Sequence, residues 1–408
     1  EMLRSLVGSE MCIRDRADTM KKLGLCACYN HKNYGSQLQS YATTVELKKR
    51  NIDYEIIRYK KKITPLLLIK AIPRLFNLVF INDRIIETFQ KKLMLKLHSQ
   101  LAEQNAVRND AFNKFSENRF KKLSPIYYGY DELKKQSEKY TAVMVGSDQL
   151  WSPSGITSNF YNLMFAGDSC TKISYATSFG VSQIEQRYHK IYKNFLDRLN
   201  YVSVRENSGK VIVDKLSIND AVVVCDPVIL LDSDEWLEEI PNKNLFNEPY
   251  IFAYFLGKSQ EYRDEVTKFA KEKNLKIVTE LHMDSYNKAD RGFGDYTPFD
   301  IGPAEFVNLI RNAKYIFTDS FHGSVFSMLY KKQFSIFNRY SNDSVSSKNS
   351  RIDSFCETYG LNDRRFSGNI NDVENAIDYD CVLEKVKNHR MLSKAFLDNA
   401  LSCFSNGD

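Results

Sequence analysis

The stretch TDSFHGSVFSM, residues 318–328, places a histidine between an aromatic residue and a glycine. An imidazole in this setting either exchanges protons near neutral pH or simply lies at the start of a helix. Ser320 is suited to cap that helix, whose first amides would stabilise an anion, and Gly323 would let a ligand approach closely. We therefore take His322 as a candidate for proton transfer. The candidates for binding an anion beside it are Ser320, Gly323 and Ser324.

A second polar set follows another predicted strand, in the stretch SVRENSG, residues 203–209. Arg205 offers a planar fork that pairs with a carboxylate or a phosphate. Asn207 and Ser208 stand where the next helix would begin, so they are candidates for binding the same ligand or for capping that helix. Arg205 has a plain alternative as well, because it can pair with a nearby carboxylate. The two strand ends together predict a ligand with two anionic groups.

Two other predicted strand ends are polar in the same way. The stretch VGSDQLW contains Asp148, which either belongs to the site or bonds its own backbone in a turn. The stretch HKNYGS contains Asn33 and Gly35 and follows the first predicted strand. Ligands of open α/β sheets bind beyond the carboxyl ends of the strands, so we expect these stretches to meet around one cleft.

The elements that must position these residues alternate between strand and helix. A buried strand at residues 21–29, the helix SQLQSYATTVELKKR and the strand NIDYEIIRY form a βαβ opening, which predicts a parallel, doubly wound sheet. A charged segment rich in Pro and Asn, near residues 232–248, separates this set from a second one that starts with the strand YIFAYFLG. The expected α/β architecture is therefore two Rossmann-like domains that face each other across a cleft.

The predicted boundaries follow from these patterns. Residues 1–19 read as a non-native or disordered prefix, because they lack both helical periodicity and the apolar core of a signal peptide. The N-terminal Rossmann-like domain spans residues 20–235 and carries a helical insertion at about 61–140, and the C-terminal Rossmann-like domain spans 236–370. Residues 371–408 form a helical tail, for which packing back on the N-terminal domain is one arrangement.

Residues 61–81, KKITPLLLIKAIPRLFNLVFI, mix basic residues and prolines into apolar runs. Lys70, Pro73 and Arg74 argue against a transmembrane helix. Two interpretations stay open: helices packed on the first domain, or a basic amphipathic segment that lies on a membrane surface or receives a lipid-linked acceptor.

Composition narrows the class of protein. The chain has 408 residues, which exceeds what one hydrophobic core usually supports. Its net charge of +6 is mild, and no basic run is interleaved with stacking aromatics, so a dedicated nucleic-acid binder is excluded and an anionic small molecule or membrane surface is favoured. The 8 Cys and 6 His show no zinc or metalloprotease spacing, which predicts no metal site and a reduced cytoplasmic location. No Walker motif and no GxGxxG follow a strand.

The ordered motifs resemble the polysaccharide pyruvyl transferase family over essentially residues 20–365. The matching blocks are NYGSQLQSYA, VGSDQLWSP, SYATSFG, SVRENSG, VCDPVILLDSDEW, IGPAEFVNLIRNAKYIFTDSFHGSVFSMLYKKQF and NSRIDSFCETYGLNDR. The resemblance implies a GT-B-like fold and transfer of the pyruvyl group of phosphoenolpyruvate to sugar hydroxyls, usually as a ketal and with no cofactor. The carboxylate and the phosphate of that donor match the two predicted anion sites.

By resemblance, each strand end receives a role. His322 matches the family's histidine and is expected to contact the phosphate and act as general acid. Arg205 would hold the carboxylate or the phosphate of the donor. Asp148 would orient or deprotonate the acceptor hydroxyl, while Asn33 and Gly35 shape the cleft.

The chain departs from the family at one position. Some members carry an Arg two residues before the histidine, where this chain has Ser320. Arg351 in NSRIDSF, a position where the family also tends to show Arg, would supply the missing charge, and Lys348 and Arg291 are the other candidates. The alternatives are a different donor geometry or a loss of activity.

We expect an enzyme of cell-surface glycan biosynthesis that works in the cytoplasm or at the inner membrane face. Its acceptor would be a glycan or a lipid-linked or nucleotide-linked sugar, and its oligomeric state stays open. Two other classes remain. One is a GT-B glycosyltransferase that uses a nucleotide sugar, although a carboxylate placed to grip a ribose after a Gly-rich loop is not evident. The other is a non-catalytic glycan-binding relative, which Ser320 supports best.

Overall fold

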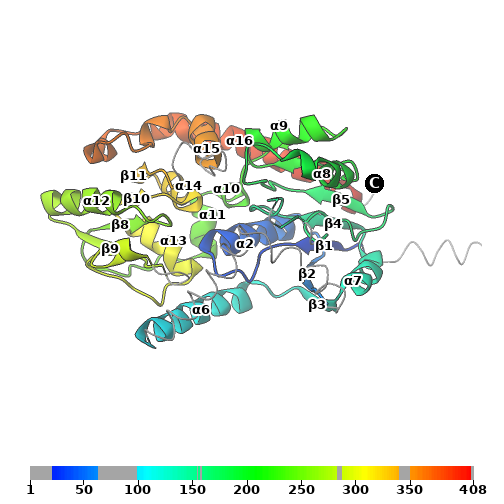
Figure 1. The fold of residues 1–408 in the computed structure, drawn as a ribbon, viewed down its shortest axis with the longest axis horizontal. Helices are drawn as coiled ribbons and strands as arrows, with labels where there is room; N and C mark the ends of the chain where they lie inside the picture. Colours follow the sequence, from blue (N-terminus) through cyan, green and yellow to red (C-terminus); the bar gives the residue numbers. More distant parts are fainter. Residues whose placement is uncertain are drawn as a thin grey trace, which may run out of the picture.

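The computed structural model describes most of the chain. The described residues are 21–62, 99–153, 155–156, 159–282, 287–339 and 350–405. They form two main parallel sheets with helices packed around them (Figure 1). We call the elements around the first sheet the N-terminal unit and those around the second the C-terminal unit.

The first sheet has the strand order β3-β2-β1-β4-β5, and every neighbouring pair is parallel. Its strands are β1 (Leu23–Cys26), β2 (Tyr54–Lys60), β3 (Leu123–Tyr128), β4 (Ala142–Val145) and β5 (Thr171–Ser174). The sequences LGLC and AVMV of β1 and β4 are buried throughout, as expected for strands covered on both faces. The order reverses between β1 and β4, which makes their carboxyl ends a topological switch point.

A two-stranded sheet of β6 (Ser203–Val204) and β7 (Val222–Val223) continues the first sheet. Parallel bridges from Ile173 to Tyr201 and from Thr177 to Val204 join it to the end of β5. The carboxyl ends of β6 and β7 therefore point toward the same edge as those of the first sheet.

The second sheet has the order β11-β10-β8-β9, again parallel throughout. Its strands are β8 (Tyr250–Tyr254), β9 (Lys276–Thr279), β10 (Tyr315–Thr318) and β11 (Gln333–Ile336). Here the order reverses between β8 and β10. The prediction of an α/β fold with two Rossmann-like sheets in a GT-B-like arrangement is confirmed.

Helices cover both sheets and join the two units. They are α2 (Tyr34–Lys49), α6 (Ser99–Arg119), α7 (Tyr130–Gln136), α8 (His189–Leu196), α9 (Asn207–Leu216), α10 (Pro227–Leu230), α11 (Ser233–Glu239), α12 (Gln260–Lys273), α13 (Pro303–Asn312), α14 (Phe321–Leu329), α15 (Ser350–Tyr359) and α16 (Tyr379–Ala400). Helix α2 packs against α10, α13 and α14, so a helix of the N-terminal unit lies against the C-terminal unit. One hydrophobic core runs through both units as a result.

Helix α2 is buried from Tyr34 to Leu47 although it carries many polar side chains. Several of these side chains bond to carbonyls of the same helix: Ser40 Oγ donates to Ser36 O at 2.8 Å, and Thr43 Oγ1 donates to Gln39 O at 2.9 Å. Such local bonds satisfy hydroxyls that burial would otherwise leave without partners. The helix can therefore lie between the units with its first turn at the switch point.

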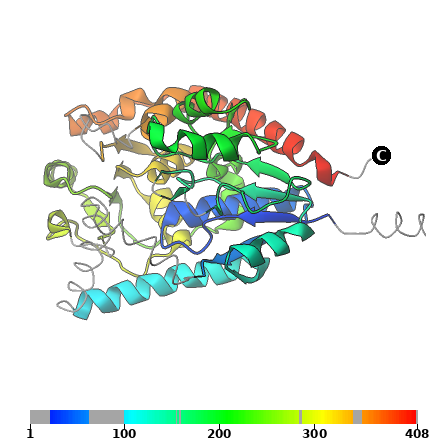
Figure 2. The ribbon, with the colours of Figure 1, turned by 45° about the vertical axis from the view of Figure 1, so that its right-hand side comes forward.

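Figures 1 and 2 show α16 along one edge of the molecule and α6 along the opposite edge. In α16, Ser393 Oγ accepts from Cys225 N at 2.9 Å and Arg390 Nε donates to Ile229 O at 2.6 Å. Asp398 pairs with Arg50 of the N-terminal unit at 2.8 Å. The tail helix thus contacts the N-terminal unit, while the predicted domain boundaries stay a prediction.

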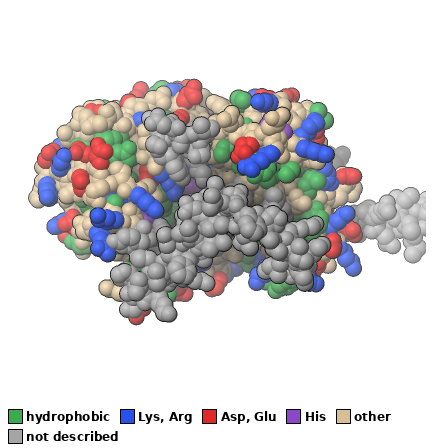
Figure 3. All heavy atoms as spheres, viewed as in Figure 1, with side chains coloured by type: hydrophobic (Ala, Val, Ile, Leu, Met, Phe, Trp, Pro, Cys, Tyr) green, Lys and Arg blue, Asp and Glu red, His purple; other side chains and the backbone are tan. Residues whose placement is uncertain are grey.

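The region predicted as a helical insertion, 61–140, contains the edge strand β3 as well as α6 and α7. Ser124 and Pro125 make this strand hard to predict from the sequence. Proline has no backbone N–H to donate, so a sheet tolerates it mainly in an edge strand. The amphipathic segment at 61–81 lies outside the described residues apart from its first two, and so does the prefix at 1–19. Among the described helices, none has the length and apolarity needed to cross a membrane. Figure 3 shows acidic and basic side chains interspersed over the described part of one face.

Candidate functional site

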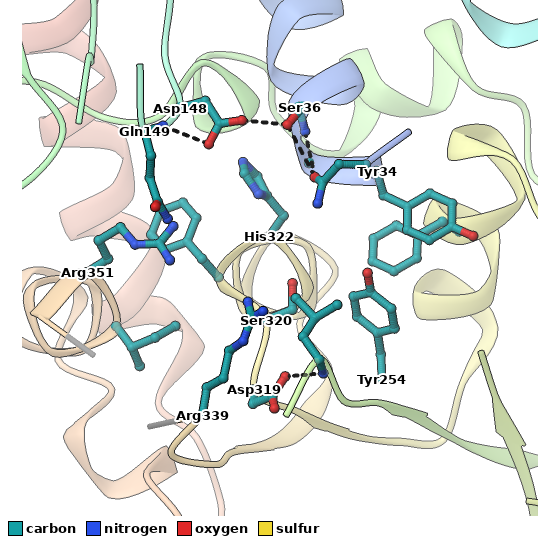
Figure 4. Close-up of a pocket in the computed structure, with 16 residues that line it drawn as sticks. Tyr34, Ser36, Asp148, Gln149, Tyr254, Asp319, Ser320, His322, Arg339 and Arg351 are labelled. Atoms are coloured by element: carbon teal, nitrogen blue, oxygen red, sulfur yellow. Dashed lines mark hydrogen bonds between the residues drawn. The ribbon is translucent and has the colours of Figure 1, made fainter. Parts of the chain in front are cut away.

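One pocket, of about 110 Å³, lies where the carboxyl ends of the two sheets meet (Figure 4). The N-terminal unit contributes residues 33–36 after β1 and 148–149 after β4. The C-terminal unit contributes Tyr254, the last residue of β8, Leu256 after this strand and residues 319–322 after β10. These are the strand ends at which both sheet orders reverse, where doubly wound folds bind ligands. The pocket is therefore built by both units.

His322 is the second residue of α14 and lies against the first turn of α2. A Cβ added to Gly35 would overlap the imidazole ring of His322, so only glycine permits this approach. His322 lines the pocket and is 8% exposed. Its Nε2 has no hydrogen-bond partner among the residues that the structure describes.

Asp226 lies behind the pocket and contacts both His322 and Arg205. Its Oδ2 accepts from Arg205 Nη1 at 2.8 Å and from Ser147 Oγ at 3.0 Å, and it lies 3.5 Å from His322 Nε2. Burial raises the pKa of Asp226, but His322 and Arg205 outweigh this effect and hold the pKa below its ordinary value. The carboxylate is therefore ionised and joins a cation of one unit to the histidine of the other.

Sequence patterns alone assign no role to Asp226, although it stands in the motif VCDPVILL. It follows β7 as Arg205 follows β6, so the rule that sites lie at strand ends applies to both residues. The signal is weak because β7 has only two residues and the Asp-Pro pair reads as the start of a helix. The side chain does cap α10, since its Oδ1 accepts from Val228 N at 3.0 Å.

Arg205 is not among the residues that line the pocket, so its contact with a ligand stays a prediction. Its guanidinium is buried over the ring of Phe321 at 4.5 Å and pairs with Asp226, with Glu206 at 3.6 Å from its Nε. The alternative that Arg205 pairs with a nearby carboxylate therefore describes the structure. A sequence cannot reveal this partner, which stands 21 residues further along the chain.

Asp148 lines the pocket opposite the start of α14. Its Oδ2 accepts from Ser36 Oγ at 2.5 Å and its Oδ1 accepts from Gln149 N at 2.8 Å. The backbone φ is 94°, a strained value for a residue other than glycine, and such strain collects at functional sites. Burial raises the pKa of Asp148, but Arg205, Ser36 and His322 together bring it below the ordinary value.

The start of α14 is built as its sequence predicts. Ser320 is the N-cap, and its Oγ accepts from Gly323 N at 3.3 Å. Gly323 is not among the residues that line the pocket. A Cβ added to it would point toward Thr318 and lie 2.8 Å from its Oγ1. Ser324 also lies behind the pocket and donates to Ser320 O at 3.0 Å.

The remaining predicted residues divide into two groups. Asn33 lines the pocket and caps α2, since its side chain accepts from Ser36 N at 3.0 Å. Arg351 also lines the pocket, where the Gln149 amide oxygen, turned toward it, accepts from its Nη2 at 2.7 Å and its Nη1 at 2.8 Å. Asn207 and Ser208 begin α9 and are not among the pocket residues.

The candidates for the missing positive charge are placed as follows. Arg351 lines the pocket, Arg291 does not, and Lys348 lies outside the described residues. The pocket has a second arginine, Arg339, which no sequence pattern indicates. In the described part of the chain, no group of His, Cys, Asp and Glu side chains is arranged to hold a metal ion.

Tyr34 connects the pocket to the interface between the units. Its ring stacks on Phe306 with centroids 4.5 Å apart, and its hydroxyl contacts the Glu280 carboxyl and lies 3.0 Å from Ile301 O. Burial raises the pKa of Glu280 to about 7, although Arg108 and the Tyr34 hydroxyl act against this rise. The Glu280 carboxyl, which titrates near neutral pH, thus contacts Tyr34, the residue that precedes Gly35 in the chain.

Several solved structures are similar to this chain at low identity. A UDP-GlcNAc 2-epimerase from Methanocaldococcus jannaschii is 12% identical, covers 90% of this chain and 92% of its own, and gives a TM-score of 0.46. A UDP-GlcNAc 2-epimerase from Neisseria meningitidis is 12% identical over 93% and 100%, with a TM-score of 0.44. An alpha-glucosyltransferase bound to UDP and DNA is 9% identical over 94% of each chain, also with a TM-score of 0.44. Values at this level carry no ligand or site over to this chain.

Sequence comparisons give one match and one negative result. No curated protein matches the chain. A family model described as "Polysaccharide pyruvyl transferase" matches residues 33–342, which include every residue of the pocket except Arg351 and Ile352.

Proposed function

Because the chain belongs to the polysaccharide pyruvyl transferase family, we propose that it moves the pyruvyl group of phosphoenolpyruvate onto sugar hydroxyls and forms a ketal. The acceptor would be a glycan or a lipid-linked or nucleotide-linked sugar of cell-surface glycan biosynthesis. The observation that carries this proposal is that His322 and Asp148, which come from different units, line one small pocket together with two arginines.

The reaction of phosphoenolpyruvate requires a proton donor, for which the pocket offers a candidate. Protonation of the methylene carbon of phosphoenolpyruvate turns C2 into an oxocarbenium-like centre, and His322 is the candidate that donates this proton. The oxygen of the first sugar hydroxyl bonds to C2. The C2–O bond to phosphate then breaks, and a second hydroxyl closes the ketal. Of the two hydroxyl protons, one replaces the proton that His322 donated and the other leaves on hydrogenphosphate. Overall, phosphoenolpyruvate and a diol give the ketal and hydrogenphosphate.

Asp148 fits an electrostatic role better than that of a strong base. Its pKa lies below the ordinary value, so it is ionised at neutral pH but holds a proton weakly. A fixed negative charge in a buried site stabilises the positive charge that develops at C2 and orients the acceptor hydroxyl. The Ser36 hydroxyl, which donates to Asp148, would keep the carboxylate in place.

The test begins with the wild-type enzyme, phosphoenolpyruvate and a panel of sugar acceptors. Phosphate release that depends on the acceptor is expected. The His322→Ala variant should lose at least about 100-fold in turnover if the imidazole is the general acid. His189→Ala is the matched control, because His189 starts α8 and lies outside the pocket.

Calorimetry with the donor alone separates this proposal from a nucleotide-sugar glycosyltransferase. Binding of phosphoenolpyruvate supports pyruvyl transfer. If the wild-type protein ignores phosphoenolpyruvate but binds a uridine diphosphate sugar, the proposal is wrong.

A further inference from the structure

Arg339 follows β11 and lines the pocket on the side of the C-terminal unit. Figure 4 shows its side chain extending toward Ser320 at the start of α14. The Arg339 stem passes Gly257, where an added Cβ would lie 3.6 Å from Cγ of the arginine. The backbone after β8 and the side chain after β11 therefore lie close together at this end of the pocket.

Asp319 is an acidic neighbour of Arg339 and also accepts hydrogen bonds from backbone amides. Asp319 Oδ1 accepts from Leu256 N at 2.6 Å, and its Oδ2 accepts from Gly257 N at 2.7 Å. Both oxygens are thus engaged in holding the turn after β8. Asp319 is buried, whereas Arg339 is exposed and lines the pocket.

The two pocket arginines reach the cavity from different segments. Arg351 belongs to the first turn of α15 and faces the amide of Gln149, while Arg339 points to the start of α14. His322 belongs to the same start of α14 and lines the cavity beside them. The pocket therefore offers two guanidinium groups at two positions around one imidazole.

We propose that Arg339 and the start of α14 bind the phosphate of the donor, while Arg351 binds its carboxylate. This inference rests on the proposed function and names the groups that recognise its donor. A helix start and a guanidinium both favour a phosphate, and a guanidinium matches a carboxylate through two parallel hydrogen bonds. The positive charge that some relatives carry at the position of Ser320 is here supplied from the end of β11.

The test measures binding of phosphoenolpyruvate by calorimetry for the wild type, Arg339→Ala and Arg339→Lys. Loss of a charge-assisted contact should weaken binding by roughly 10- to 100-fold in Arg339→Ala, with a smaller loss in Arg339→Lys, which keeps the charge but not the fork. Arg187→Ala removes the same charge from an exposed arginine that does not line the pocket and should leave binding unchanged. Thermal unfolding of each variant checks that it is folded.

Inorganic phosphate and pyruvate test the assignment of the two arginines. Arg339→Ala should weaken phosphate more than pyruvate, and Arg351→Ala should do the reverse. Equal binding of phosphoenolpyruvate by the wild type and Arg339→Ala overturns this inference but leaves the proposed function standing. A wild-type protein that binds no phosphoenolpyruvate overturns the proposed function instead.

Discussion

Nε2 of His322 lies 3.5 Å from Oδ2 of Asp226, and this contact crosses from the C-terminal unit to the N-terminal unit. The same oxygen accepts from Arg205 Nη1 at 2.8 Å, so the histidine belongs to a buried charged group behind the pocket. The two sheets therefore share one electrostatic arrangement as well as one core.

Replacing Asp226 by Asn should lower both stability and turnover. Asparagine keeps the shape but leaves the buried guanidinium of Arg205 without its closest counter-charge, which should cost about 3 kcal/mol in the free energy of unfolding. Turnover should fall while the KM for phosphoenolpyruvate changes little, because Asp226 does not line the pocket. Urea unfolding and phosphate release measure the two effects. Ser147→Ala removes a hydrogen bond to the same oxygen and a longer one from Arg205 but keeps the carboxylate, and it is the control. A large rise in KM with normal turnover would contradict this view.

Replacing Gly35 by Ala should displace His322, since the new Cβ would occupy the space of the imidazole ring. A shift of about 1 Å in a catalytic group costs roughly 100-fold in rate, so turnover should fall by about that factor. Gly167→Ala is the matched control, because no atom lies near its added Cβ. Steady-state kinetics measures the turnover of both variants. Equal rates would mean that the position of His322 does not limit the reaction.

Stability should depend on pH through Glu280. The pKa of this carboxyl is about 7 in the folded protein, against about 4.5 in the unfolded chain. A raised folded-state pKa means that the stabilisation is full below about pH 4.5 and is lost as the pH rises toward 7, on the order of 3 kcal/mol. The Tyr34 hydroxyl has one proton for two acceptors, so a protonated Glu280 that donates to Tyr34 satisfies both contacts.

The measurement for Glu280 is urea unfolding of the wild type and Glu280→Gln at pH 5 and pH 8. The wild type should lose stability between these values, while the variant, which cannot ionise, should lose less. Asp148 and Asp226 do not interfere, because their lowered pKa values act only as the pH falls below about 4. The same pH dependence in both proteins would rule out Glu280 as the cause.

The sequence reveals the pocket where its residues directly follow a strand. Asn33, Gly35, Asp148 and His322 all stand in polar stretches behind apolar runs, so the rule for parallel sheets is enough to group them. Two apolar strand sets separated by a charged segment likewise predict the two sheets. These inferences use local patterns, which a single sequence contains.

Partners that come from distant segments cannot be read in this way. The sequence does not show that Asp226 pairs with Arg205, because the two residues come together only in the fold. Arg339 stands in a polar loop like many others, and only the packing of β11 beside β10 brings it to the pocket. Strand β3 is not predicted from the sequence because it contains Ser124 and Pro125. A sheet accepts this proline because β3 lies at its edge.

The contact between Gly35 and His322 also limits how such a protein can be recombined. One residue belongs to each unit, so the imidazole ring and the space that receives it come from different halves of the chain. A chimera that joined this N-terminal unit to the C-terminal unit of a relative would place its histidine correctly only if the angle between the units were preserved. The surroundings of the imidazole thus depend on the orientation of the two units, and a nuclear magnetic resonance label on it would detect a change in that orientation.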